Sequence, residues 1–177
     1  MSLNDRASSW TGEAYRHIPV TAKDVLDFRW AAASNENRWN AAGEPTLYLA
    51  GDIGIAVAEW GRHYDERRNP TVKAGAVERS VYRLELALER IVDLRNKEVW
   101  DDLKLDNPPY CFLDKSLARL IAQRYRKTTL VQGLVVPSVA ALDDLERWCL
   151  VLFLEKMQPD PKAFFTATHH ERSLRLE

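Results

Sequence analysis

The sequence has few cysteines and no excess charge of either sign. Cys111 and Cys149 are too few for a disulfide scaffold or for a zinc site built from paired Cys-x-x-Cys motifs. The 25 Lys and Arg residues nearly cancel the 26 Asp and Glu residues, which leaves a net charge of -1. No general basic field exists for binding nucleic acid, so no direct nucleic-acid partner is expected. The alternative is a nucleic-acid-binding protein that uses the basic runs 62–68 and 119–127. The acidic residues interleaved in these runs weigh against it.

Long apolar runs are also missing. The longest, residues 148–154, is far too short to span a bilayer. Residues 1–10 include Asp5 and Arg6 and lack the apolar stretch of a signal peptide. Both cysteines stand among apolar neighbours, which favours buried thiols and fits a reducing compartment. The sequence therefore predicts a soluble, cytoplasmic protein with no membrane partner.

Several motifs with strong fingerprints are absent as well. The chain has no Gly-x-Gly-x-x-Gly run, no Gly-Lys-Ser/Thr phosphate loop and no Gly-x-Ser-x-Gly turn. None of its four histidines shows the His-Glu-x-x-His spacing of zinc hydrolases. His169 and His170 fall in the polar segment 166–177, which is expected to be a solvated tail. Common nucleotide folds, serine hydrolases and zinc hydrolases thus lose support, and no metal site is expected.

What the chain does have is enough apolar and aromatic residues for one well-packed domain. Apolar residues make up 46% of its 177 residues. The six Trp, six Tyr and five Phe can fill a core or line a pocket for a flat ligand. Strands and helices do not alternate strictly, which favours an α+β fold. Strands are expected at 15–20, 46–50, 81–88, 133–137, 148–155 and 163–168, helices at 21–30, 52–64 and 116–126, and an irregular stretch with one helical turn at 94–109. In the strand at 81–88, Leu84, Leu86 and Leu88 should alternate inward. Asp52 should cap the helix at 52–64, and Leu120 is one marker of the amphipathic helix at 116–126.

Three side chains suited to chemistry stand in one loop, strand and helix, residues 37–59. Arg38 offers a planar fork for a phosphate or carboxylate, or else a surface cation stacked on Trp39. Tyr48 offers a flat face for a ring-shaped ligand, or else a half-buried strand tyrosine. Glu59 lies in a largely apolar helical turn, as a structural ion-pair partner or as a catalytic carboxylate. Each alone favours the structural interpretation, but this segment can bring all three to one end of a sheet.

Taken together, these positions resemble the RES-domain family, which is named for its Arg, Glu and Ser positions. The resemblance covers about residues 14–155 of a single domain spanning 1–177. Its fairly specific part is the spacing from the Arg-Trp-Asn run to the glutamate. The matching residues are Tyr15-Arg16 in the first strand, Arg38-Trp39-Asn40, Gly43, Leu47-Tyr48-Leu49-Ala50, Glu59, and Gly133-Leu134-Val135-Val136-Pro137-Ser138 as the third motif.

Two positions depart from the pattern of that family. Asn37 stands where a glycine commonly precedes the Arg-Trp-Asn run. His17 follows Arg16 where another aromatic residue such as tyrosine is expected. The second departure bears on one side of the pocket and not on the reaction.

The resemblance implies an ADP-ribosyltransferase-like fold, a split, mostly antiparallel β core with surrounding helices and an NAD-binding cleft. Many members are toxins of bacterial type II toxin–antitoxin systems, neutralised by a neighbouring helix-turn-helix antitoxin of the Xre type. They consume NAD as a substrate by hydrolysis or phosphorolysis, or transfer ADP-ribose to a protein. The expected function is therefore an NAD-degrading toxin. The alternatives are an ADP-ribosyltransferase acting on a cellular protein and a non-catalytic interaction module that retains the fold.

The resemblance also implies roles for single residues, with Glu59 and Arg38 as the catalytic pair. Cleavage of the nicotinamide–ribose bond leaves an oxocarbenium-like ribose, whose charge the Glu59 carboxylate would stabilise. Arg16 and Arg38 would neutralise the pyrophosphate, and Tyr48 would stack on nicotinamide. Val57 stands where transferases of this fold usually carry an acidic residue or glutamine, which favours a small-molecule acceptor. Asn40 would orient the loop, and Ser138 would hydrogen-bond the ribose or the nicotinamide amide.

Overall fold

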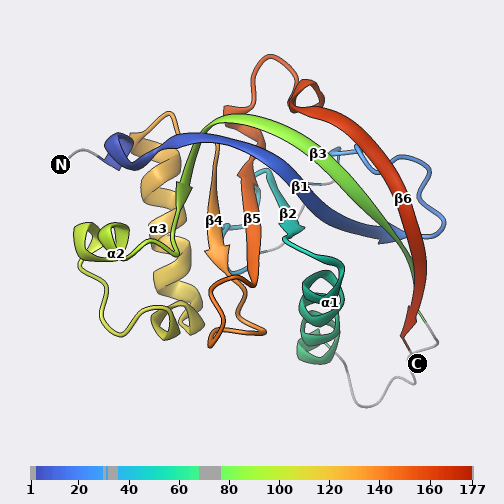
Figure 1. Ribbon diagram of the computed structural model, residues 1–177, viewed down its shortest axis with the longest axis horizontal. Coiled ribbons are helices and arrows are strands. Elements are labelled where there is room, and N and C mark those ends of the chain that lie inside the picture. Colours follow the sequence, from blue (N-terminus) through green and yellow to red (C-terminus); the bar gives the residue numbers. More distant parts are fainter. Residues whose placement is uncertain (1–2, 30, 32–35, 68–76, 177) are drawn as a thin grey trace.

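The computed structural model describes residues 3–29, 31, 36–67 and 77–176. Three long strands arch over three short ones, and helices pack below and beside the short strands (Figure 1). The strands are β1 (Ser8–Pro19), β2 (Thr46–Ala50), β3 (Val77–Asp93), β4 (Gly133–Pro137), β5 (Trp148–Phe153) and β6 (Phe165–Leu176). The α-helices are α1 (Ile53–Arg67), α2 (Lys97–Leu103) and α3 (Lys115–Thr128), and the 3-10 turns are η1 (Leu3–Arg6), η2 (Tyr110–Leu113), η3 (Leu154–Lys156) and η4 (Pro161–Phe164).

Hydrogen bonds join all six strands into one sheet in the order β1-β2-β5-β4-β3-β6. The sheet closes on itself because β1 also pairs with β3, in a ladder that runs from Trp10 opposite Leu88 to Pro19 opposite Arg79. Among the strand pairs of the described residues, only that of β3 with β4 is parallel. This mixture of a mostly antiparallel sheet with helices on its faces confirms the expected α+β class.

Strands β4 and β5 are covered on both faces, which explains their unbroken apolar sequences. All five residues of β4 are buried. One face of these strands packs against β1, β2 and β3, and the other packs against α3. The expected alternation in β3 is also confirmed, because Leu84, Leu86 and Leu88 are at most 3% exposed while Ala87 and Glu89 are exposed.

The turn from β2 into α1 places the glutamate-bearing helix beside the sheet. Gly51 passes so close to Trp148 that a Cβ atom would lie 2.6 Å from its indole ring. Asp52 then caps the helix as expected, since its carboxylate accepts a hydrogen bond of 2.8 Å from the Ile55 amide. Glu59 follows in the second turn of this helix.

Residues 21–29 do not form the expected helix but a series of turns and bends. The spacing of Val25 and Phe28 fits a helix, yet two aspartates divert the backbone. Asp24 accepts a hydrogen bond from the Leu26 amide at 2.7 Å, and Asp27 accepts one from the Arg29 amide at 3.1 Å. Such bonds to the residue two positions on stabilise turns in competition with helix. Residue 30, the end of the expected helix, lies outside the described residues.

The polar segment 166–177 was expected to be a solvated tail. Residues 166–176 instead form most of β6. This strand pairs with β3 from Phe165 opposite Leu86 to Leu176 opposite Val77. Its side chains are mostly exposed, so composition does not mark it as a strand. A strand on an exposed edge is held by its backbone ladder and by cross-strand pairs, here Glu171 with Arg83 at 2.9 Å. His169 and His170 accordingly lie in an exposed strand.

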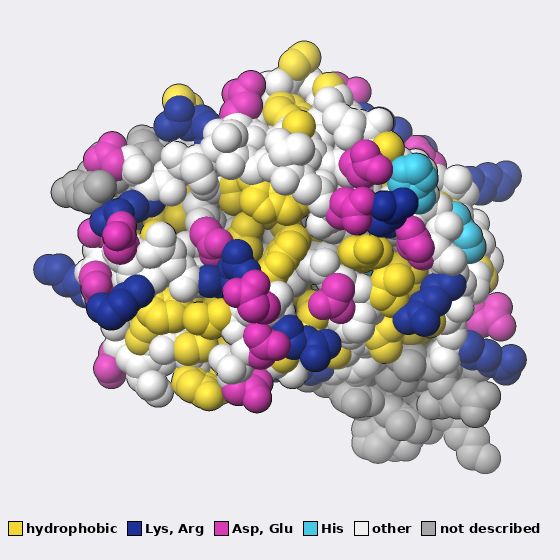
Figure 2. All heavy atoms as spheres, viewed as in Figure 1, with side chains coloured by type: hydrophobic (Ala, Val, Ile, Leu, Met, Phe, Trp, Pro, Cys, Tyr) yellow, Lys and Arg dark blue, Asp and Glu magenta, His cyan; other side chains and the backbone are white. Residues whose placement is uncertain are grey.

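The molecular surface agrees with the near-zero net charge. On the face shown in Figure 2, side chains of both signs are interspersed, with no large area of one sign. Among the described residues, no helix is long and apolar enough to cross a membrane. The cysteines were expected to be buried; Cys111 and Cys149 are both partly buried.

Candidate active site

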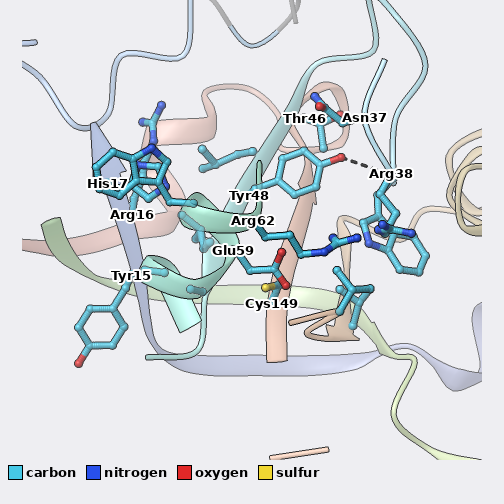
Figure 3. Close-up of a pocket in the computed structure, with 18 of the residues that line it drawn as sticks. Tyr15, Arg16, His17, Asn37, Arg38, Thr46, Tyr48, Glu59, Arg62 and Cys149 are labelled. Atoms are coloured by element: carbon cyan, nitrogen blue, oxygen red, sulfur yellow. Dashed lines mark hydrogen bonds between the residues drawn. The ribbon is translucent and has the colours of Figure 1, made fainter. Parts of the chain in front are cut away.

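A cleft of about 750 Å³ opens where β1, β2 and α1 meet the loop at 36–44 (Figure 3). Of the residues predicted from the sequence, Arg16, Arg38, Tyr48 and Glu59 line it. Asn40 and Ser138 do not line the cleft; both are completely buried behind its wall. The structure thus brings the predicted residues together. Four of them line the cleft, and Asn40 and Ser138 lie behind its wall.

Glu59 is held from behind by the segment that follows β4. The Ser138 hydroxyl donates a hydrogen bond of 2.6 Å to its Oε1 atom. The Ala140 amide lies 3.4 Å from the same oxygen and 3.3 Å from the Ser138 hydroxyl oxygen. The carboxylate is therefore oriented by fixed donors while its side chain remains partly exposed to the cleft. Fixed orientation is what electrostatic stabilisation of a developing cation requires.

Cys149 also lines the cleft. It lies on β5, opposite Ala50 on one side and Val136 on the other. Burial raises the pKa of its thiol well above the ordinary value, and the nearby Glu59 carboxylate adds to this effect. A hydrogen bond with Ser138 acts in the opposite direction but is weaker. The thiol therefore stays protonated, which argues against a nucleophilic cysteine here.

Tyr48 presents its ring to the cleft and its hydroxyl to the loop. The hydroxyl donates to Oδ1 of Asn40 at 2.7 Å and accepts from the Trp39 amide at 3.1 Å. Burial raises the pKa of this phenol far above its usual range, so it stays neutral. Asn40 in turn donates from Nδ2 to the Ala41 carbonyl at 2.8 Å. Tyr48 and Asn40 thus tie the loop to β2, and only the tyrosine ring is available to a ligand.

Arg38 is buried, with 9% of its surface exposed, so it is not the surface cation of the alternative interpretation. Its Nη1 atom donates to the carbonyls of Phe112 and Leu113, at 2.6 and 2.8 Å, at the end of η2. Trp39 beside it packs on Phe112, with ring centroids 5.4 Å apart. These contacts fix the guanidinium at the wall of the cleft.

Arg16 forms part of the opposite wall, on β1. It donates to the Val25 carbonyl and stacks over Phe28, 5.4 Å from the ring centroid. Burial lowers the pKa of its guanidinium to about 10, although Asp24 and Asp27 partly oppose this effect. Arg16 therefore remains charged at neutral pH but is poorly solvated, a state that favours contact with an anion.

His17 keeps an aromatic ring at the position where the sequence departs from the family pattern. Its imidazole lies 5.5 Å from the indole of Trp60, between ring centroids. Its Nδ1 atom accepts a hydrogen bond of 3.1 Å from Nε of Arg79. Because Nδ1 is the acceptor, the proton of the neutral ring is placed on Nε2. The histidine thus supplies packing on this side of the cleft, as a tyrosine ring would.

Three further cations line the cleft, and the sequence did not predict them there. They are Arg62, Lys115 and Arg119. Arg62 lies three residues after Glu59, and this helical spacing was a signal that could have placed it on the same face of α1. Figure 3 shows both side chains extending from the helix into the cleft. Arg119 reaches the cleft from α3, where it pairs with Glu36 at 2.8 Å and donates to the Asn37 carbonyl. No local pattern in the sequence indicates that contact.

The charges that line the cleft are mostly positive. Five cationic side chains face two carboxylates, which suits a ligand with more than one negative charge. Within the described residues, no three His, Cys, Asp or Glu side chains gather as metal ligands would. The cationic lining residues are Arg16, Arg38, Arg62, Lys115 and Arg119, and the carboxylates are Glu36 and Glu59.

Comparisons with known proteins agree with this geometry. The family model described as the RES domain matches residues 10–175. A chain in the crystal structure of the M. tuberculosis MbcT–MbcA toxin–antitoxin complex is similar in fold, with a TM-score of 0.63 and 17% sequence identity. The match covers 96% of this chain and 86% of that one. No curated protein matches the sequence. Since the family model spans nearly the whole sequence and includes every residue of the cleft, the chain belongs to the RES-domain family.

Proposed function

We propose that this protein cleaves NAD at the nicotinamide–ribose bond and acts as the toxin of a type II toxin–antitoxin system. The observation that carries the proposal is the Glu59 carboxylate, fixed by Ser138 at 2.6 Å inside a cleft lined mainly by cations. Membership of the RES-domain family supports it, since NAD chemistry is associated with that family. An ADP-ribosyltransferase-like fold is part of the same proposal.

The chemistry follows from the charges of the substrate. The diphosphate of NAD would lie against the cations, with Arg38 and Arg16 on opposite walls, and nicotinamide would stack on the ring of Tyr48. Glu59 would stabilise the positive charge that develops on the ribose as the carbon–nitrogen bond breaks. Nicotinamide leaves with the electron pair of that bond. Water or inorganic phosphate then bonds to the ribose carbon and gives up a proton, leaving ADP-ribose or its 1-phosphate.

The acceptor is proposed to be a small molecule, not a protein. Val57 stands two positions before Glu59 on α1 and supplies no polar group that could orient a protein side chain. The toxin role and an Xre-type helix-turn-helix antitoxin as partner are supported by the family and by the likeness to a chain of a toxin–antitoxin complex. The NAD consumed would be that of the cytoplasm.

The decisive test replaces Glu59 by glutamine. Glu59→Gln keeps an acceptor for Ser138 and should fold normally, while nicotinamide release from NAD falls by about 100-fold or more. Nicotinamide is measured by chromatography, once in buffer without phosphate and once with inorganic phosphate. Glu36→Gln is the matched control, a carboxylate of the same cleft without the contact to Ser138, and should retain most activity.

Two results would overturn the proposal. One is a folded wild-type protein that releases no nicotinamide in either buffer. The other is a folded Glu59→Gln variant with full activity. The toxin role is tested separately by expression in a bacterial host, where the wild type should stop growth and Glu59→Gln should not.

A further inference from the structure

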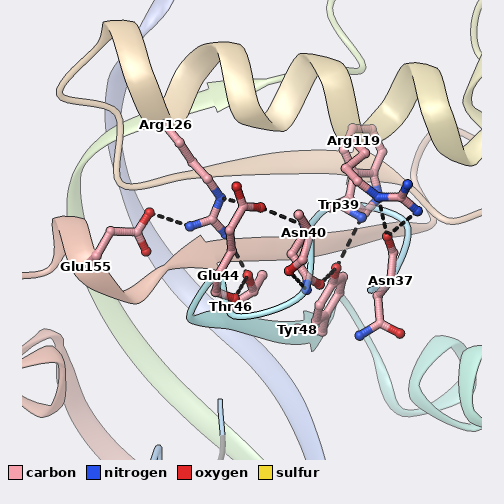
Figure 4. A network of polar contacts seen from close by, with 10 residues as sticks. Asn37, Trp39, Asn40, Glu44, Thr46, Tyr48, Arg119, Arg126 and Glu155 are labelled. Carbon is pink, nitrogen blue, oxygen red and sulfur yellow. Dashed lines mark hydrogen bonds and ion pairs between the residues drawn. The ribbon is translucent and has the colours of Figure 1, made fainter. Parts of the chain in front are cut away.

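Arg126 on α3 lies behind the loop at 36–44 and does not line the cleft (Figure 4). Only 5% of its side chain is exposed. Its guanidinium donates through Nη1 to Glu155 and through Nη2 to the Thr46 hydroxyl, the latter at 2.5 Å. Its carbon centre also lies 4.0 Å from the centroid of the Phe153 ring. One buried side chain thus connects α3, η3 and the start of β2.

The same guanidinium reaches the loop through Glu44, whose Oε2 lies 3.8 Å from Nε of Arg126. That oxygen accepts a hydrogen bond of 2.7 Å from the Ala41 amide. Thr46 is linked as well, because its hydroxyl donates to the Glu44 carbonyl at 2.9 Å. Both ends of the turn from Ala41 to Thr46 are therefore joined to Arg126, and Gly43 supplies the left-handed conformation, with φ of +80°, that the turn needs.

The turn continues directly into the cleft wall. Asn37 and Asn40 form a bridge through the Asn37 amide and the Asn40 carbonyl, 3.1 Å apart, with Arg38 between them. Asn40 also holds the Tyr48 hydroxyl. Movement of the turn would therefore displace Arg38 and release the Tyr48 ring. Glu59 and Ser138, on α1 and after β4, are hydrogen-bonded to each other and should stay in place.

Holding a loop with a buried, charged network costs more free energy than holding it with apolar packing. A guanidinium removed from water needs excellent geometry to recover its solvation, and apolar side chains of similar volume stabilise a core as well or better. What the planar guanidinium offers instead is direction, because its two Nη donors point along fixed lines to Glu155 and Thr46 at once while Nε faces Glu44 at ion-pair distance. That property suits a role in fixing geometry.

We propose that Arg126 is a positioning residue, which holds the turn at 41–46 through Glu44 and Thr46 and thereby sets Arg38 and Tyr48 for substrate binding. It touches no ligand. For its effect on turnover, the inference rests on the proposed NAD cleavage; for its effect on the loop, it does not.

The first experiment measures the loop without any substrate. Amide hydrogen exchange is compared in the wild type, in Arg126→Met and in Arg124→Met, an exposed arginine on the same helix. Exchange over residues 37–48 should rise about tenfold in Arg126→Met alone, because the Ala41 and Trp39 amides lose fixed acceptors. Exchange over α1 and β4 should not change. Unchanged exchange at 37–48 in a folded Arg126→Met variant would overturn the inference.

The second experiment separates binding from chemistry. Arg126→Met should raise KM for NAD about tenfold and leave kcat within about threefold, since the Glu59 site is untouched. Arg126→Lys should recover part of the loss, because a lysine can pair with Glu155 or Glu44 but cannot fork to both. A purely structural role would instead lower the active fraction, and with it kcat, at constant KM.

Controls keep the two proposals distinguishable. If Arg126→Met does not fold, Glu44→Leu breaks the contact to the Ala41 amide at a partly exposed position and should show the same rise in exchange and KM. A wild type that releases no nicotinamide refutes the proposed function, while the exchange comparison still decides the role of Arg126. Raised exchange with an unchanged KM would refute the positioning role and leave NAD cleavage standing.

Discussion

The hydroxyl of Ser138 donates to Oε1 of Glu59 over 2.6 Å, joining the segment after β4 to the second turn of α1. The two residues are 79 positions apart in the sequence. Ser138 has no exposed surface, so in the structure it acts on the cleft from behind, through the Glu59 carboxylate that it orients and through its contact with the Cys149 thiol. This differs from direct contact with ribose or nicotinamide, the role that the family resemblance implied. We therefore propose that Ser138 acts as a positioning residue for Glu59.

Replacing Ser138 by alanine tests that relationship. Ser138→Ala removes the short hydrogen bond and leaves the carboxylate only the longer contact with the Ala140 amide. We expect kcat for nicotinamide release to fall about tenfold with little change in KM, because an interaction that orients the proposed catalytic carboxylate acts on the transition state.

A double-mutant cycle supplies the control for this prediction. If Ser138 acts through Glu59, the double variant Ser138→Ala with Glu59→Gln should be no slower than Glu59→Gln alone. Ser80→Ala, on β3 and outside the cleft lining, should leave the rate unchanged. Additive losses in the cycle would instead indicate an independent role for Ser138, such as a ligand contact in a more open conformation.

Much of the fold is predictable where a strand or helix carries its own signal. The apolar run of β4 and the Asp52 cap of α1 are local patterns, and both are confirmed. The turns at 21–29 are not predicted, because side-chain hydrogen bonds of Asp24 and Asp27 override the helical spacing. The strand expected at 163–168 overlaps the start of β6, but the extension of β6 to Leu176 depends on pairing with β3. Those interactions appear only in the folded chain.

Helix α3 was predicted at the correct residues, but it does not bury all of the face that its sequence indicated. Its bounds agree with the expectation, yet Leu120, a marker of its apolar face, is 63% exposed. The fully buried positions are Ala118 and Ala122, which let the helix approach the sheet closely, and Tyr125. The amphipathic pattern predicted the length of the helix but not which of its faces packs against the sheet.

The residues of the candidate site also fall into a group that the sequence predicts and a group that it does not. Arg38, Tyr48 and Glu59 lie within one continuous segment, and the cleft brings them together as the spacing indicated. Arg119 and Arg126 come from α3, and their contacts with the loop depend on how that helix packs. Sequence alone therefore predicts the residues that face a ligand better than those that hold them in place.

Tyr48→Phe separates the two functions of that tyrosine. The change removes the hydroxyl, and with it the donor to Oδ1 of Asn40 and the acceptor of the Trp39 amide. We expect the free energy of unfolding in urea to fall by about 1–3 kcal/mol, the usual cost of losing two such hydrogen bonds. Because the ring remains, kcat for nicotinamide release, measured at saturating NAD and at a temperature where the variant is folded, should stay within about threefold of the wild type.

Tyr15→Phe is the matched control, since Tyr15 also lines the cleft but points its hydroxyl away from the other labelled residues in Figure 3. It should leave the free energy of unfolding nearly unchanged. A Tyr48→Phe variant as stable as the wild type would show that the hydroxyl does not tie the loop to β2.

The stability of the protein should fall in alkaline solution because of Tyr125. Burial against the sheet raises the pKa of its phenol from about 10 to about 12. The unfolded chain loses this proton near pH 10, whereas the folded chain keeps it until about pH 12, so the folded state binds more protons in that window. The corresponding stability, about 2–3 kcal/mol from a shift of this size, is fully present below pH 10 and is lost as the pH rises through 12.

Several other groups modify this dependence; burial of the Cys149 thiol, for example, raises its pKa and acts in the same direction as Tyr125. The raised pKa of Tyr48 acts in the same direction as that of Tyr125. Arg16 acts in the opposite direction, because its folded pKa of about 10 lies below the ordinary value and the unfolded chain then binds more protons above pH 10. Urea unfolding at pH 8, 10 and 11.5 measures the sum. Tyr125→Phe retains the ring and should show a smaller loss of stability between pH 10 and 11.5 than the wild type; an equal loss in both proteins would assign the alkaline sensitivity to other groups.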